Sequence, residues 1–217
     1  MTSKYLSGRV QRVKSKKIIK GAIITFSPTT VSFYLDGKNF AFDYSNESIH
    51  ALDKLLSFVK FRTLRIDREL FDPKNVELFE KVKNSWISSV KNVKKLYIPS
   101  IEGYEEEFLK LLSLIDNLEE LEIRYPISSK QLILQILAKM KNVKSLYLSG
   151  KMDDEFLKLL ASKTSPEKPL IKCRIYASFS TFTVDAEEKF KQDVYCVKKD
   201  KIKFHNDSNN TAFVHNW

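Results

Sequence analysis

Side chains that could carry out catalysis or hold a metal are few in this sequence, and they are scattered. The three histidines are His50, His205 and His215. None stands at helical spacing from a second histidine, so the sequence does not predict a zinc site. The motifs G-x-S-x-G and G-x-x-x-x-G-K-[ST], which mark a serine nucleophile and a phosphate-binding loop, do not occur. We therefore expect no catalytic residue, no metal, no cofactor and no enzymatic activity.

Two other groups of reactive side chains have structural explanations. The carboxylates of Asp153, Asp154 and Glu155 could form an acid/base or metal cluster. They precede an amphipathic segment, however, and the helix dipole favours carboxylates in a first turn, so we expect them to begin a helix. Cys173 occupies an apolar position of a repeat and should be a buried thiol. With only Cys196 besides it, a disulfide scaffold or four-cysteine metal site is excluded.

An internal repeat accounts for the middle of the chain. Three segments read Asn, apolar, two polar, Leu, any residue, apolar, and their leucines (Leu96, Leu121 and Leu146) are 25 residues apart. The same L-x-x-L-x-L frame fits residues 61–66 and 170–175. Each frame alternates like a short buried strand, and the spacing is typical of a leucine-rich repeat. We predict five adjacent parallel strands, centred on Leu64, Leu96, Leu121, Leu146 and Cys173.

Amphipathic helices are predicted between the frames, because apolar residues recur there at steps of three and four. The predicted helices span residues 73–88, 103–114, 128–140 and 153–162, with Asp72, Ser128 or Ser129, and Asp153 as N-caps. Strands alternating with helices give parallel sheets. A flat doubly wound sheet is the alternative, but near-identical units with one helix each favour helices on one side. The usual Asn or Cys after the third apolar position is missing, which predicts irregular repeats with no side-chain bond to the turn. The residues near that position are Ser100, Tyr125 and Gly150.

The segment before the repeats has a different pattern. Residues 18–26 and 30–35 are β-rich, and the Asp36-Gly37 turn dipeptide leads into residues 38–44. This order predicts an antiparallel meander, and residues 46–60 then read as a helix.

After residue 176 the pattern weakens. Residues 180–192 read as a helix or loop, and residues 194–198 with 201–205 predict a hairpin. The expected fold class is therefore α/β: an irregular leucine-rich-repeat-like βα solenoid with parallel strands, preceded by an N-terminal antiparallel β-meander. The expected organisation is a basic segment (1–17), a single domain (18–205) and a loose tail (206–217).

Composition limits the classes of protein that this chain can belong to. Its 217 residues are 43% hydrophobic and 29% charged, enough to build a core and too apolar for overall disorder. No run of about 18 apolar residues occurs, so we expect no transmembrane helix and no membrane partner. The first residues lack the apolar run of a secretory signal. We therefore expect an intracellular protein, either cytoplasmic or nuclear.

Much of the positive charge lies near the start of the chain. The net charge is +10, and seven basic residues precede Asp36, the first acidic residue. A basic segment can bind nucleic acid or anionic lipid, although it can equally be a solvated face. Nucleic-acid binding is therefore the alternative function. Its candidate residues are Arg9, Arg12, Lys14, Lys16, Lys17 and Lys20.

The order of meander, helix and βα repeats resembles the F-box-associated region of the large nematode F-box protein groups. The resemblance covers residues 20–178 and is one of pattern. Residues 1–13, with Thr2-Ser3-Lys4 and Val10, look like the end of an F-box, while the Leu-Pro entry and three-helix unit of that domain are missing. The resemblance implies the substrate-recognition part of a ubiquitin-ligase adaptor, with its F-box lost or truncated. Its partner would be a ligase substrate or component.

The remaining candidate site is the exposed face of the predicted sheet. Residues between the buried leucines should point outward and align from repeat to repeat. Tyr and Arg are enriched at protein interfaces, although Tyr also favours strands for its own packing. We expect this face to bind a protein partner. The central column is Arg65, Tyr97, Glu122, Tyr147 and Arg174, and its neighbour contains Asp67, Pro99, Arg124, Ser149 and Tyr176. The predicted binding residues are Arg65, Tyr97, Glu122, Arg124, Tyr147, Arg174 and Tyr176.

Overall fold

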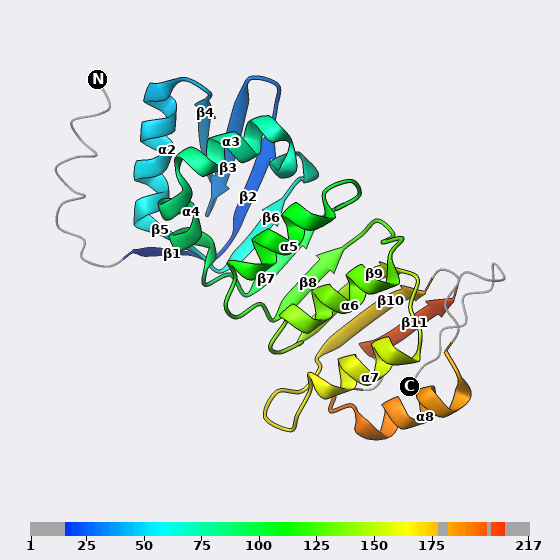
Figure 1. Ribbon diagram of the computed structural model, residues 1–217. Coiled ribbons are helices and arrows are strands. Elements are labelled where there is room, and N and C mark those ends of the chain that lie inside the picture. Colours follow the sequence, from blue (N-terminus) through cyan, green and yellow to red (C-terminus); the bar gives the residue numbers. More distant parts are fainter. Residues whose placement is uncertain (1–15, 178–181, 199–200, 207–217) are drawn as a thin grey trace.

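The computed structural model describes residues 16–177, 182–198 and 201–206 (Figure 1). These residues form a mixed α/β structure with seven α-helices and a mostly parallel sheet of nine strands. A further pair of short strands forms a separate two-stranded sheet.

The five repeat frames form adjacent parallel strands, as predicted. Direct pairs join Leu64 to Leu96, Leu96 to Leu121, Leu121 to Leu146, and Leu146 to Cys173. These five side chains are buried, because every second residue of each strand points into the core. The strands are β6 (Thr63–Ile66), β7 (Lys95–Ile98), β8 (Glu120–Ile123), β9 (Ser145–Gly150) and β10 (Lys172–Ala177).

One backbone arrangement is repeated at the start of successive strands. The carbonyl oxygen of Lys94 accepts the N–H groups of both Glu119 and Glu120, each at 2.9 Å. The carbonyl oxygens of Arg62, Glu119 and Lys144 accept two consecutive N–H groups of the next strand in the same way. A carbonyl oxygen has two lone pairs and can satisfy both donors. The step from one strand to the next is therefore the same four times.

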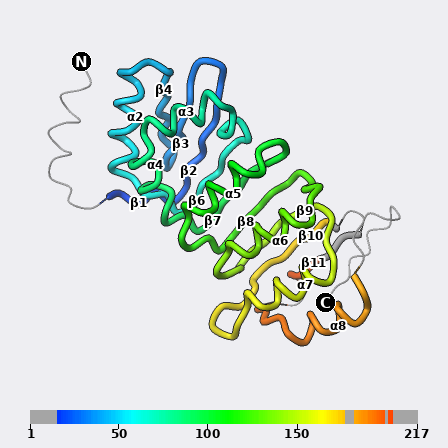
Figure 2. Tube along the Cα trace, in the orientation of Figure 1, coloured from blue at the N-terminus to red at the C-terminus, as the bar shows by residue number. Residues whose placement is uncertain are grey.

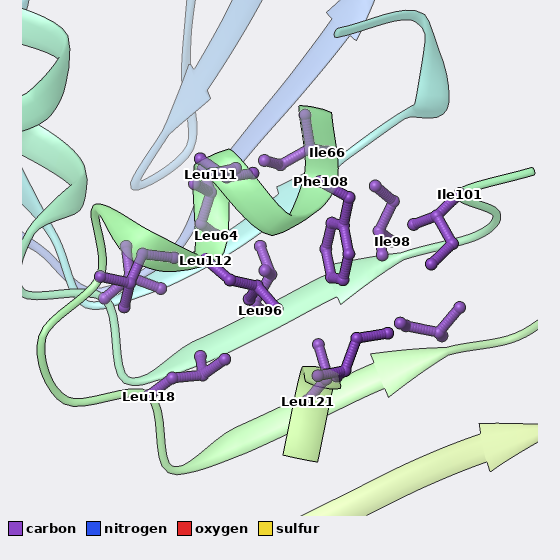
Figure 3. Packing of buried hydrophobic residues seen from close by; sticks show 14 of the residues in the cluster. Leu64, Ile66, Leu96, Ile98, Ile101, Phe108, Leu111, Leu112, Leu118 and Leu121 are labelled. Carbon is purple, nitrogen blue, oxygen red and sulfur yellow. The ribbon is translucent and has the colours of Figure 1, made fainter. Parts of the chain in front are cut away.

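Three helices cover one face of the parallel strands. They are α5 (Glu105–Ser113), α6 (Lys130–Lys139) and α7 (Asp154–Ser162), and they lie on the same side of the sheet (Figure 1). Figure 3 shows Phe108, Leu111 and Leu112 of α5 directed at the buried side chains of the strands. The N-caps expected for the last two helices are confirmed, because the side chains of Ser129 and Asp153 accept the N–H groups of Leu132 and Glu155.

The single helix predicted over residues 73–88 is wrong. The chain forms the 3₁₀ turn η1 (Arg68–Phe71), then α3 (Pro73–Lys81) and α4 (Lys83–Val90), with a break at Val82. The break brings the rings of Phe79 and Trp86 to 4.5 Å between centroids. In a continuous helix, seven residues would separate them by about 10.5 Å along the axis. Both rings are buried, so core packing outweighs helix continuity here.

Asp72 stands at the predicted N-cap position before α3, with Pro73 at the first turn, but its side chain makes no capping hydrogen bond. Its carboxylate instead accepts the hydroxyl of Tyr104 at 2.6 Å. This hydrogen bond joins the start of α3 to the residue that precedes α5.

The predicted meander is confirmed as β2 (Ala22–Phe26), β3 (Thr30–Leu35) and β4 (Lys38–Asp43), which pair antiparallel. Helix α2 (Asn46–Phe58) follows as expected. The β-rich residues 18–26, predicted to belong to the meander as a whole, do so only in part, because β1 (Lys17–Ile19) is separate from β2. It pairs with β5 (Val59–Phe61) in the small sheet, whereas β2 pairs in parallel with β6.

The C-terminal hairpin prediction is also wrong. After α8 (Val184–Asp193), strand β11 (Ile202–Asn206) pairs in parallel with β10, while residues 194–198 make only an isolated bridge through Cys196. Ile202 lies beside Cys173 and is buried, so covering this apolar edge favours the parallel strand. Of the predicted tail, residues 207–217 lie outside the described residues.

The strands of the large sheet are ordered β11-β10-β9-β8-β7-β6-β2-β3-β4. The colour gradient in Figure 2 runs along the molecule, so units that are successive in sequence are neighbours in space. The meander and the parallel strands thus form one continuous sheet.

The turns after the strands differ between repeats. Ser100 is buried, and its hydroxyl accepts the N–H of Glu102 at 3.2 Å. The prediction that no side chain would bond to the turn is therefore wrong for the turn after β7. At the end of β9, Gly150 has a φ of +151° and lies against the backbone of Ile127.

Replacement of Leu121 by alanine should lower the free energy of unfolding by about 2–5 kcal/mol, because this side chain is 2% exposed and its removal leaves a cavity. Tyr97→Ala on the opposite face should change it by no more than about 0.5 kcal/mol. Urea denaturation measures both. Equal destabilisation by the two variants would contradict the assignment of the strand faces.

A second substitution tests the contact between β9 and the preceding turn. A Cβ atom at residue 150 would lie 2.3 Å from the carbonyl oxygen of Ile127, so Gly150→Ala should destabilise the fold by about 1–3 kcal/mol. Gly21→Ala is the matched control, since its Cβ would meet nothing within 4 Å. If thermal denaturation gave the two variants the same midpoint, the close approach at Gly150 would be refuted.

Candidate functional site

The candidate site is the face of the large sheet opposite α5, α6 and α7, which we call the open face. Its central row crosses five strands in direct register, confirming the predicted alignment. The row consists of Arg65, Tyr97, Glu122, Tyr147 and Arg174. That this row binds a partner remains a prediction.

The predicted residues are not equally accessible. Arg65, Arg124 and Arg174 are exposed, and the three tyrosines of the set are half-buried. The expectation that Glu122 is exposed holds only in part, since 24% of its side chain is accessible. Neighbouring strands lie about 4.8 Å apart, so long side chains on one face cover each other. Ser149, predicted in the neighbouring column, is buried.

Charges at the centre of the open face are paired within the protein. Arg124 Nε lies 2.7 Å from Glu122 Oε1, and Lys95 Nζ lies 2.7 Å from Glu120 Oε1. The hydrogen bond to Glu120 raises the pKa of Lys95 above its ordinary value. The centre therefore presents aromatic and hydrogen-bonding surface with little net charge. Arg65 adds a cation–π contact, since its guanidinium carbon lies 5.9 Å from the centroid of the Tyr97 ring.

The rings of Tyr147 and Tyr176 form a second aromatic element, on β9 and β10. Their centroids are 5.3 Å apart, with an interplanar angle of 45°. Partial burial, together with the neighbouring Tyr176 phenol, raises the pKa of Tyr147 above 10.0. The Tyr147 phenol is consequently a neutral hydrogen-bonding group at physiological pH.

Shallow pockets connect the predicted residues. One of about 230 Å³ and one of about 160 Å³ are both lined by Tyr97 and Glu122. A third, of about 440 Å³, lies beyond the carboxyl ends of β2, β6 and β7 and shares Asp67 and Pro99 with the first. Burial, followed by the nearby Glu69, raises the pKa of Asp67. These shallow pockets suit the side chains of a partner better than an enclosed small molecule.

The open face also includes residues that were not predicted. Lys95, Glu120 and Lys172 could have been found, because each is the outward residue preceding a buried frame position. Ile23 and Tyr34 extend the central row into the meander. Ile23 and Tyr34 could not have been found from the sequence, because no local pattern indicates that β2 lies beside β6.

Among the candidate nucleic-acid-binding residues, Lys16, Lys17 and Lys20 lie in or next to β1. Arg9, Arg12 and Lys14 are outside the described residues. Lys16 donates a hydrogen bond to Ser88 Oγ at 2.6 Å, and partial burial, with a smaller effect of Lys60, lowers its pKa. The side chains of Lys17 and Lys20 are exposed.

Within the described part of the chain, no three His, Cys, Asp or Glu residues are grouped so that they could hold a metal ion. Cys173 is fully buried, which raises the pKa of its thiol and disfavours the nucleophilic thiolate. Asp154 accepts two hydrogen bonds from Thr183. Among the described helices, none has the length and apolar character needed to cross a membrane.

Comparison with protein-family models, with curated proteins and with solved structures found no match to this chain.

An ion-pair ladder lies along the edge of the sheet where the parallel strands begin. The carboxylate of Glu119 lies 2.8 Å from both Lys94 Nζ and Lys144 Nζ, so it connects three successive repeats. Its side chain is only 16% exposed. Burial alone would raise its pKa, but the two lysines outweigh this effect and hold the pKa below the ordinary 4.5.

Replacing Glu119 by glutamine should lower the stability at neutral pH by about 1.5–3 kcal/mol, because charge-assisted hydrogen bonds to both lysines are lost. A carboxylate with a lowered folded-state pKa stabilises the fold above its unfolded pKa, and the effect is lost as pH falls through the folded-state value. The difference from wild type should therefore shrink below about pH 4.5. Urea denaturation from pH 7 to pH 3 measures it.

Glu77→Gln is the control, since it removes a single exposed i,i+4 ion pair with Lys81, which solvent screens, and it should change the stability much less than Glu119→Gln does. If Glu119→Gln cost no more than this control at neutral pH, the ladder would have no structural role.

Proposed function

We propose that this protein is a non-enzymatic interaction module that binds a protein partner on its open face. The observation that carries the proposal is the central row, in which five strands present two tyrosines, two arginines and a glutamate in direct register. Tyrosine and arginine offer a large contact area together with hydrogen bonding, and they are frequent among the residues that dominate binding energy.

The arrangement of the row supports this proposal. Its side chains are held by pairs within the protein, such as Glu122 with Arg124, and by ring contacts, such as Tyr147 with Tyr176. Side chains that are already ordered lose less conformational entropy when a partner binds.

We further propose that the strand and helix units are an irregular leucine-rich-repeat-like solenoid, as in the F-box-associated regions that the sequence resembles. The repeated two-donor hydrogen bonds and the helices on a single face support this interpretation. On that resemblance, the chain would serve as the substrate-recognition part of an F-box-type ubiquitin-ligase adaptor.

Capture of partners with the intact chain as bait tests the proposal, with captured proteins quantified by mass spectrometry. Tyr97→Ala should weaken partner binding by about 1 kcal/mol or more, roughly fivefold, while changing the free energy of unfolding by no more than about 0.5 kcal/mol. Co-capture of ubiquitin-ligase components tests the adaptor role separately.

Tyr195→Ala is the matched control. This tyrosine is 49% exposed, and it lies outside the open face, where its backbone pairs with Leu170 before β10. If the Tyr97 variant captured every protein as well as wild type did, or if both tyrosine variants lost the same proteins equally, the open face would not be the binding surface.

A further inference from the structure

The open face is electrostatically uneven. Over β7 and β8, the charges of Lys95 and Arg124 are matched by Glu120 and Glu122. Over β10 and β11, Lys172, Arg174 and Lys203 form no ion pair with any described carboxylate. We call these three cations the basic strip.

The basic strip lies beside the tyrosine pair. Arg174 is in direct register with Tyr147 on one side and Lys203 on the other, and Lys172 precedes it by two residues on the same face. Tyr176 follows two residues later, and its ring contacts Tyr147. Hydrogen-bonding phenols and cations without a described carboxylate partner therefore border one another on three adjacent strands.

We infer that the basic strip binds an acidic segment of the protein partner, an inference that rests on the proposed function. Carboxylates are complementary to its charge, and arginine can bind a carboxylate through two parallel hydrogen bonds. Same-face residues of an extended chain repeat at about 6.6–6.8 Å, which matches the step from Lys172 to Arg174. The occupant is thus an extended peptide with acidic residues at alternate positions, and the tyrosine pair contacts its flank.

A nucleic-acid strand fits this surface less well. Proteins that follow a phosphate backbone use a continuous positive groove. Here the carboxylates of Glu120 and Glu122 lie on β8, two strands away from β10, and they interrupt the positive surface of the open face.

Fluorescence anisotropy of the full chain with a labelled polyglutamate peptide tests the inference. The Lys172→Glu/Arg174→Glu variant should bind the peptide about tenfold more weakly than wild type. Lys172→Gln/Arg174→Gln, which introduces no repulsive charge, should show a smaller loss. Polyglutamine should not bind, and added salt should weaken the polyglutamate complex.

The matched control is Lys110→Glu/Lys158→Glu, which changes the net charge equally on α5 and α7, the helices of the covered side. Equal weakening by the two glutamate variants would overturn the inference, because it would indicate binding through net charge or through the basic residues before Asp36. The inference would also be overturned if the protein bound oligo-dT more tightly than polyglutamate and if Lys172→Glu/Arg174→Glu abolished the binding of oligo-dT. That result would indicate a nucleic-acid partner. If the basic strip does not bind polyglutamate while Tyr97→Ala still reduces partner capture, the proposed function stands. In that case only the inference that the partner presents an acidic segment is wrong.

Discussion

The structure depends on burying one apolar side chain from each parallel strand at the same level. Leu96, Leu121 and Leu146 pair directly, and Leu64 and Cys173 extend this row at its two ends. Because side chains alternate along a strand, a slip of one residue would turn tyrosines, lysines and glutamates into the core. The register that buries the leucines therefore also creates the central row of the open face.

Surface charge follows the same register. Lys91 pairs with Asp116, Lys94 with Glu119, and Lys95 with Glu120, so each pair joins residues 25 positions apart. Such contacts arise because successive strands pair in parallel with matching register, which brings residues 25 positions apart side by side. They neutralise the middle of the sheet, whereas the cations over β10 and β11 have no carboxylate partner among the described residues. This difference is the reason for proposing that an acidic segment of the partner binds at that end.

The two ends of the row of parallel strands have to be covered by further strands. A terminal strand leaves an edge and part of an apolar row uncovered. The structure extends the sheet with β2, β3 and β4 on one side and with β11 on the other, and the buried Ala22 and Ile202 continue the apolar row. These extensions also widen the open face beyond the five repeats, adding Ile23, Tyr34 and Lys203 to it.

Much of the fold could be predicted from the sequence, because the repeat is local and periodic. The spacing of Leu96, Leu121 and Leu146, with the same frame at residues 61–66 and 170–175, determined five strands, their buried faces and the alignment of the central row. Ser129 and Asp153 marked helix starts. Only the tertiary structure decided the contacts between segments that share no sequence pattern. Among these are the separation of β1 from β2, the break at Val82 that lets Phe79 meet Trp86, and the parallel pairing of β11. Ion pairing was equally hidden, because whether Arg124 or Arg174 finds a carboxylate depends on distances across strands, which residue types alone do not contain.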